Sequence, residues 1–249
     1  MAKKTRQAAS GGSEMKKFYW ILGIVAVVAI GVVGYSIGTS AIGSAVAEPV
    51  DVEGLDDPTR LVELAQGVTM GDPDAPITII EFGDYQCPGC GAFAQQVKPQ
   101  IEFAYVEPGT ARFVYYDYPI INAHPQAFLA ARAARCAGDQ DRYWDYHTVL
   151  FQNQGRWSGS GNAAGAFISY AEELALDADA FEACLRSDRH ADVVTANMRL
   201  GQELGVPGTP TVMVSRGQGM ARRVSGNSFQ AIQDAVESLQ QPQGEGGER

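Results

Sequence analysis

The sequence predicts an α/β domain with a helical insertion, preceded by one transmembrane helix. Three observations lead to this fold class. Residues 77–82 are a β-branched apolar run typical of a buried strand, and a helical segment follows them almost at once. Residues 211–215 form a similar run, but roughly 90 residues separate it from the strand predicted at 111–118. A crossover between strands needs only about a dozen residues, so most of that stretch is an insertion.

The N-terminal segment has the pattern of a membrane anchor. Residues 1–17 contain five basic side chains against one acidic side chain, and residues 18–42 carry no charge. An apolar run of this length spans a bilayer with its basic flank in the cytoplasm, so we expect a single-pass protein of the cell membrane with its domain on the extracytoplasmic side. Residues 45–47 have a small-x-small pattern, which leaves a cleaved signal peptide as the alternative.

The remainder of the chain is acidic. Residues 1–47 contribute +4 to a net charge of −10, so the rest carries −14. A domain this acidic is a poor nucleic-acid binder, because phosphate contacts need Lys and Arg. Residues 43–67 predict a polar linker, residues 68–240 are long enough for one core, and residues 241–249 predict a disordered tail.

A Cys-Pro-Gly-Cys motif at 87–90 lies where the first strand passes into a helix predicted over about 88–106. Cys87 would lie at the start of this helix, where unpaired N–H groups and the macrodipole favour a thiolate. A thiolate is the form that attacks a disulfide. Cys90, about one turn further, would be more buried and would resolve the mixed disulfide.

Two other interpretations of the motif are weaker. A zinc clip needs four ligands, and the other cysteines and the histidines are scattered along the sequence, so no metal site is expected. A purely structural disulfide is the second alternative, but so small a ring is strained and reducible, which suits exchange better. The scattered residues are Cys136, Cys184, His124, His147 and His190.

The later elements are predicted from composition and from residues that end helices and strands. The insertion, about residues 121–206, predicts several helices. A short edge strand at 222–224 and a closing helix at 228–240 complete the domain. The predicted insertion helices cover about 124–137, 141–153, 163–174, 178–186 and 188–204.

Pro210 precedes the strand at 211–215, and a proline cannot donate to a sheet ladder. An ordinary Pro-Gly turn is one interpretation of this segment. Combined with a Cys-x-x-Cys motif after a strand, however, the pattern predicts a thioredoxin-like fold. In that fold Pro210 would be a cis-proline facing the cysteines, and the groups before it would be free to pair with a substrate strand.

Four segments resemble, in order, those of DsbA-like thiol:disulfide oxidoreductases. They are residues 71–90, 112–119, 142–147 and 206–212. The resemblance extends over roughly residues 68–238. It implies a thioredoxin-like fold with a helical insertion. One departure is Gly89, where family members often carry His, Tyr or Phe, so redox strength is not carried over.

The resemblance also implies roles for individual residues. Cys87 and Cys90 would be the redox-active pair. The substrate groove would be formed by Pro88, Gly89, Thr209 and Pro210. A buried Glu81 would accept or return the proton of Cys90, and the alternative is a strand-end acid that reaches solvent.

Function and partners follow from this resemblance. We expect disulfide formation in exported proteins that bear cysteines, without a bound cofactor, because the disulfide itself carries two electrons. A quinone-linked membrane enzyme, DsbB-like or vitamin K epoxide reductase-like, would reoxidise the pair. A disulfide reductase or isomerase remains an alternative, as does a non-catalytic, tethered thioredoxin-fold chaperone or metal-delivery module.

Cys136 and Cys184 both fall in the predicted insertion. In an oxidising compartment two isolated cysteines of one subdomain favour a structural disulfide. Two buried free thiols, acting as small hydrophobic side chains, are the alternative.

Overall fold

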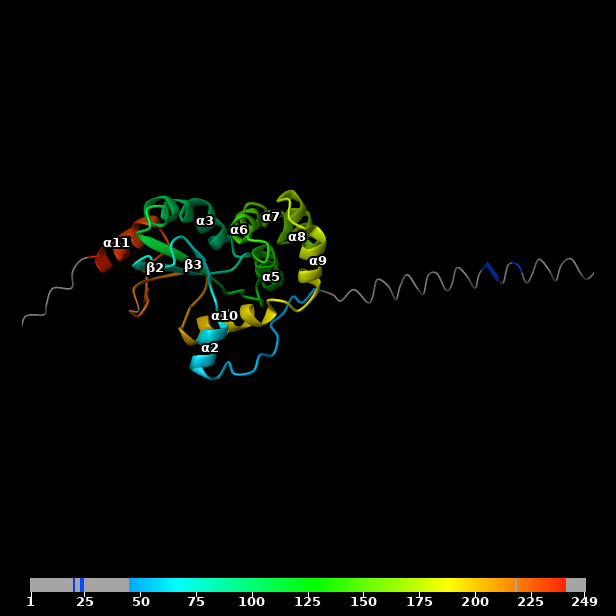
Figure 1. Cartoon of the computed structure of the whole chain (residues 1–249), viewed down its shortest axis with the longest axis horizontal. Coiled ribbons are helices and arrows are strands. Elements are labelled where there is room, and N and C mark those ends of the chain that lie inside the picture. Colours follow the sequence, from blue (N-terminus) through cyan, green and yellow to red (C-terminus); the bar gives the residue numbers. More distant parts are fainter. Residues whose placement is uncertain (1–19, 21–22, 25–44, 218, 241–249) are drawn as a thin grey trace, which may run out of the picture. The chain divides into compact units, whose positions relative to one another are not determined.

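A computed structural model describes residue 20, residues 23–24, residues 45–217 and residues 219–240 (Figure 1). The chain divides into two units, residues 1–44 and 45–249. The anchor predicted at 18–42 lies outside the described residues except for Trp20, Gly23 and Ile24, and the predicted tail at 241–249 lies wholly outside them. Among the helices of the described part, none has both the length and the apolar character needed to cross a membrane.

The second unit is built on a five-stranded sheet with the order β1-β3-β2-β4-β5. β2 and β3 are parallel, and the other neighbouring pairs are antiparallel. The strands are β1 Val68–Met70, β2 Ile77–Gly83, β3 Ala111–Asp117, β4 Thr211–Arg216 and β5 Arg222–Arg223. The three long strands agree with the sequence prediction. β1 was not predicted, because three residues are too few to display an alternating pattern.

The helix expected over 88–106 is divided into three parts. α3 spans Pro88–Gln96, α4 spans Lys98–Ile101, and η1, a π-helical turn, spans Glu102–Val106. Pro99 explains the break, because a proline inside a helix lacks the N–H that would bond to the residue four positions before it.

The insertion is helical, as predicted. The helix at 178–186 has the predicted bounds, the other predicted helices are shorter at one end or both, and a short helix at 154–157 was not predicted. α11 closes the chain, and α2 lies before the sheet. The helices are α2 Pro58–Leu64, α5 Ala127–Gly138, α6 Tyr143–Gln152, α7 Gln154–Trp157, α8 Ala163–Glu173, α9 Ala178–Arg186, α10 Ala191–Glu203 and α11 Phe229–Gln240.

The linker expected over 43–67 is, from Ala45 onward, part of the second unit. Leu61 of α2 is buried with Ala196 of α10, and the Val50 N–H donates to Thr195 Oγ1 at 3.2 Å. Because this segment is mostly polar, its one apolar helix face was not predicted. The residues that cover this face lie more than 130 positions away in the sequence.

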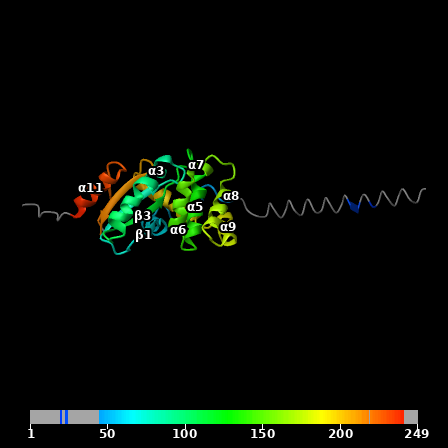
Figure 2. The ribbon, with the colours of Figure 1, turned by 90° about the horizontal axis from the view of Figure 1, so that it is seen from above.

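The layers place the two faces of the sheet in different environments. α3 and α11 lie on one face, α10 and α2 lie on the other, and α5 to α9 gather at one side of the sheet (Figures 1 and 2). Along β2, Ile79 belongs to the core beneath α3, whereas Phe82 packs with Val206 and the α10 side. Strand alternation therefore points Glu81 toward α3 and the cysteine motif.

Candidate active site

The cysteine motif occupies the junction of β2 and α3. Cys87 is the N-cap residue of α3, and Pro88 takes the first helical position, where its missing N–H costs nothing. Both cysteines are free thiols. Cys87 is half-buried, whereas Cys90 is fully buried. The helix start therefore presents one sulfur to the surface and withholds the other.

Cys87 is held as a thiolate by its surroundings. Its pKa is lowered to about 5, first by a hydrogen bond from the Cys90 thiol, then by the Thr209 side chain and the backbone N–H groups of Cys90 and Gly89; partial burial opposes the shift. At neutral pH Cys87 is therefore almost entirely a thiolate and a good leaving group.

Cys90 has the opposite chemistry. Burial raises its pKa well above the usual value, and the hydrogen bond it donates to Cys87 and the nearby Glu81 raise it further. Its sulfur also accepts a 3.4 Å hydrogen bond from the Asp84 N–H. Cys90 therefore keeps its proton at neutral pH when the pair is reduced.

Glu81 lies beneath the pair as a buried carboxyl group. It is inaccessible to solvent, and neither oxygen has a hydrogen-bond partner among the described residues. Burial raises its pKa to about 8; Lys98 opposes that shift and Cys87 adds to it. Its β3 neighbour in the register is Tyr115. A carboxyl group in this state can exchange a proton near neutral pH.

The second half of the site comes from the loop before β4. The peptide bond between Thr209 and Pro210 is cis. The Thr209 carbonyl lies 3.4 Å from Cys87 Sγ. A Cβ atom on Gly89 would lie 3.2 Å from Pro210 Cδ, so the two loops are in close contact. The structure thus brings together all the residues predicted for the pair, the groove and the buried acid.

Asp84 was not predicted from the sequence. Its buried carboxylate accepts hydrogen bonds from the N–H groups of Gln86 (2.7 Å), Cys87 (3.2 Å) and Ile120 (2.8 Å), and it contacts His124 Nδ1 at 2.7 Å. An Asp three residues before a helix N-cap is a local turn signal that could have identified it.

Gln154 was also missed. Its side-chain amide donates to the backbone carbonyls of Tyr85 (2.7 Å) and Cys87 (2.9 Å). It comes from α7 of the insertion, so no signal near the motif in sequence points to it. The insertion therefore helps to hold the active-site loop.

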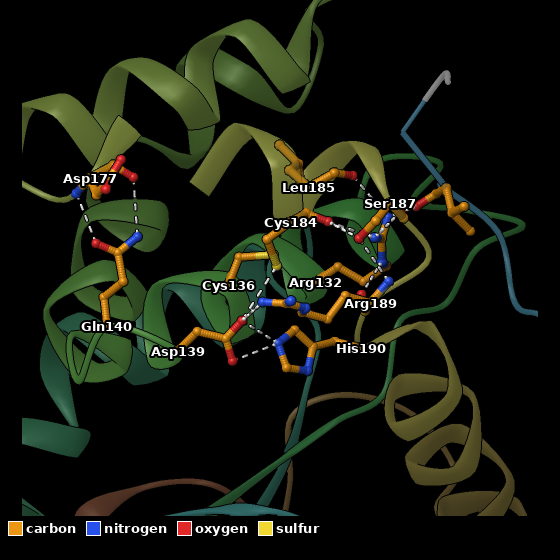
Figure 3. The surroundings of a disulfide bond; sticks show 11 residues. Arg132, Cys136, Asp139, Gln140, Asp177, Cys184, Leu185, Ser187, Arg189 and His190 are labelled. Carbon is orange, nitrogen blue, oxygen red and sulfur yellow. Dashed lines mark hydrogen bonds and ion pairs between the residues drawn. A yellow bond between two sulfur atoms is a disulfide. The ribbon is translucent and has the colours of Figure 1, made fainter. Parts of the chain in front are cut away.

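Cys136 and Cys184 lie elsewhere. They form a disulfide between α5 and α9, with a Cα–Cα distance of 5.9 Å and a sequence separation of 48 (Figure 3). Both are buried. This pair joins two helices of the insertion.

Comparisons with known proteins agree with this architecture. A thioredoxin family model matches residues 63–235. The probable disulfide bond formation protein D of Bacillus cereus is 25% identical, with 75% of this chain and 87% of that protein covered. Oxidised BdbD of Bacillus subtilis has the same fold, with a TM-score of 0.61 and 23% identity over 79% of this chain and 98% of that chain.

A Na(+)/H(+) antiporter NhaA 1 from Salinispora arenicola is 34% identical over 75% of this chain. The present chain spans only 26% of the length of that antiporter. The similarity therefore concerns one part of a much longer protein.

Proposed function

We propose a function from the premise that the chain belongs to the thioredoxin family and is a DsbA-like thiol:disulfide oxidoreductase. In this proposal the protein forms disulfides in exported proteins by exchange at Cys87 and Cys90. The observation that supports this most strongly is the asymmetry of the pair. Cys87 is a half-buried, stabilised thiolate beside a cis-proline loop, and Cys90 is a buried thiol that keeps its proton.

The reaction begins with the pair oxidised. A substrate thiolate attacks Cys87 Sγ, the bond between Cys87 and Cys90 breaks, and Cys90 leaves with the electron pair. Glu81, protonated at neutral pH because its pKa is about 8, lies where it can give the departing Cys90 sulfur a proton.

In the second step another substrate thiolate attacks the substrate sulfur of the mixed disulfide. The substrate disulfide forms, and Cys87 leaves as a thiolate. Its lowered pKa makes it a good leaving group. Two electrons have then passed from the substrate dithiol to the enzyme pair, and no bound cofactor takes part.

Substrate binding is assigned to the groove around Cys87. The N–H and C=O groups before Pro210 are free of the β4 ladder and can pair with an extended substrate segment. Pro88, Gly89 and Thr209 border the same sulfur. Gly89 leaves room for a substrate backbone over the helix start.

Exchange with a reduced two-cysteine peptide tests the assignment. The oxidised wild type should oxidise the peptide, and Cys87→Ser should not. Cys90→Ser, incubated instead with the oxidised peptide, should form a mixed disulfide through Cys87 that mass spectrometry detects, with the second peptide sulfur leaving as a thiol. Full activity in Cys87→Ser would contradict the proposal. Activity that survives EDTA separates this enzyme from a metal-delivery module using the same thiols, whereas loss of activity in EDTA favours that module.

We further propose that residues 18–42 anchor the protein with its N-terminus in the cytoplasm and its redox domain outside. The five basic residues before Phe18 support this orientation. Protease added to spheroplasts should digest the domain and spare the N-terminus. Protection of the whole domain would contradict an extracytoplasmic location.

The reduced pair would be reoxidised by a quinone-linked membrane enzyme of the DsbB or vitamin K epoxide reductase type. Membranes supplied with quinone should then convert the reduced protein to the disulfide form, and membranes depleted of quinone should not. The reduction potential of the Cys87–Cys90 pair distinguishes this oxidase from a reductase or isomerase that uses the same residues.

A further inference from the structure

Two further side chains that can bind a metal ion, His190 and Asp139, lie beside the Cys136–Cys184 disulfide. His190 offers a ring nitrogen, and this nitrogen and the sulfurs of Cys136 and Cys184 all lie within 4.8 Å of one another. Asp139 completes the group, because its Oδ2 lies 3.6 Å from Cys184 Sγ and both its oxygens lie 3.1 Å from His190 Nε2. Figure 3 shows these side chains converging from three segments of the chain.

We propose that Cys136, Cys184, His190 and Asp139 form a zinc site when the disulfide is reduced. Two thiolates, one imidazole and one carboxylate are a donor set that suits tetrahedral Zn²⁺. The disulfide and the metal are then alternative cross-links between α5 and α9. The site is distinct from the Cys87–Cys90 pair and is not needed for exchange there.

The geometry requires one small movement. Zn–S bonds of about 2.3 Å place two thiolates about 3.8 Å apart on a tetrahedral ion, so the two sulfurs must separate once the disulfide is reduced. The separations from Asp139 to His190 and to Cys184 are already close to those of neighbouring ligands. Breaking the S–S bond and separating the two sulfurs would complete the shell.

The backbone holds His190 in a special conformation. It is the residue before α10, with φ 66° and ψ 1°, a left-handed conformation that costs free energy for most residues other than glycine. This conformation accompanies the contact of its ring with Asp139. His190 is partly exposed and lines a pocket of about 370 Å³ that Asp139 also lines, which offers a route for the metal.

Two arginines lie beside the site. Arg132, one helical turn before Cys136 on α5, is fully buried. Its guanidinium donates to backbone carbonyls, among them those of Cys184 and Leu185, and the charge of Asp188 acts on it. Arg189 is exposed and lies 3.0 Å from Asp139. Its ion pair with Asp139 must break when the carboxylate binds the metal. The guanidinium then remains nearby and balances the charge of the carboxylate.

The chemistry balances with a dithiol as reductant. The dithiol gives two electrons to the disulfide and becomes a disulfide itself, while Cys136 and Cys184 become thiols. Zinc then displaces the two thiol protons, which are released to solvent.

The test uses the full chain carrying Cys87→Ser and Cys90→Ser, so that only one cysteine pair remains. The protein is reduced with dithiothreitol under anaerobic conditions, freed of reductant and titrated with Zn²⁺ against a chromophoric chelator. We expect one zinc ion per chain, and none in the oxidised protein. Co²⁺ should give thiolate charge-transfer bands and the intense visible bands of a tetrahedral site.

Ligand variants then separate this site from unspecific thiol binding. Asp139→Asn is isosteric, and His190→Asn removes the imidazole while keeping a residue that tolerates the left-handed conformation. Each should weaken zinc binding about tenfold or more. Asp141→Asn is the matched control, because Asp141 borders the same pocket, has φ 59°, and should bind zinc like the parent.

Three outcomes would overturn the proposal. They are no zinc in the reduced protein, equal affinity in His190→Asn and the parent, and equal binding when Cys136→Ser and Cys184→Ser are added. If the reduced chain unfolds, zinc should restore its far-ultraviolet circular dichroism. A reduced chain that stays unfolded with zinc would also contradict the proposal.

Discussion

The two cysteine pairs of this domain differ in their spacing along the chain and in how far their sulfurs are exposed. Cys87 and Cys90 are three positions apart at the start of one helix, with one sulfur half-buried and 3.4 Å from the carbonyl oxygen of Thr209. Cys136 and Cys184 are 48 positions apart, join two helices and are 1% and 4% exposed. Exchange needs an accessible sulfur that is stable as a thiolate, whereas burial slows the attack of a thiolate on a cross-link.

The carboxyl groups near the two pairs differ as well. Glu81, beneath the active pair, is fully buried and has no hydrogen-bond partner among the described residues. Asp139, beside the other pair, is partly exposed and contacts Arg189 and His190. A buried, unpaired acid such as Glu81 has a displaced pKa and can move protons near neutral pH, whereas Asp139 is held in contacts with a guanidinium and an imidazole.

The largest expected contrast is in alkylation of the reduced protein. Cys87 should react with iodoacetamide with a half-maximal rate near pH 5, because its pKa is about 5 and only the thiolate reacts. Cys90 should react far more slowly at pH 7, since burial raises its pKa and keeps the reagent from its sulfur. Peptide mass mapping between pH 4 and 9 measures both, and first labelling of Cys90 would reverse the assignment of the nucleophile.

Removal of the second pair should lower stability and leave exchange intact. Cys136→Ala with Cys184→Ala opens a loop of 48 residues, which costs about 4 kcal/mol in the chain-entropy model. Urea unfolding in EDTA, which keeps metal away from the site, measures this loss. The rate at which Cys87 oxidises a dithiol peptide should stay within about twofold, and a parallel fall in that rate would show that the two pairs are coupled.

Glu81→Gln should stabilise the protein in a pH-dependent way. The unfolded Glu81 ionises near its usual value of 4.5, but the folded one keeps its proton until about pH 8. Folding therefore takes up a proton between these values, and the free energy of unfolding falls as pH rises through this window. Glu81→Gln does not lose stability in this way. The free energy of unfolding of the variant should therefore exceed that of the wild type by an amount that grows from pH 4.5 to pH 8 and reaches a few kcal/mol.

Urea unfolding of the reduced protein at pH 4.5, 6 and 8 measures the effect. An advantage for Glu81→Gln that is the same at all three pH values would show that Glu81 does not hold its proton in the fold.

The smallest expected effect concerns the residue between the cysteines. Gly89 has no side chain to stabilise the Cys87 thiolate, whose pKa of about 5 lies above the value of about 3.5 of DsbA, the strong oxidant at about −120 mV. We expect a weaker oxidant than DsbA. Gly89→His should raise the reduction potential by roughly 30 mV, a tenfold change in the exchange equilibrium.

Gly89→Ala is the matched control for this substitution, because both variants introduce a Cβ atom 3.2 Å from Pro210 Cδ. Equilibration with glutathione measures the potentials. Equal shifts in the two variants would assign the effect to the contact with Pro210, and no shift in either would show that Thr209 and the backbone set the potential.

The sequence by itself determined the features that short segments encode. The β-branched run, the proline at the helix start and the proline before the last long strand place β2, α3 and β4 to within a residue or two at most ends. The proline-induced break at Pro99 was also local, and the helix was nevertheless expected to run on to 106. These signals act within a few residues, because capping, φ restriction and strand alternation are properties of neighbouring positions.

The tertiary structure alone decided which distant residues meet. Gln154 reaches the Cys87 carbonyl from 67 positions away, and His190 comes beside Asp139 across 51. The scattered cysteines and histidines disfavoured a metal site, yet the packing of α5, α9 and the start of α10 brings two cysteines and one histidine together. Such contacts depend on how whole helices bury their apolar faces against one another, and no local pattern records the partner that each face will find.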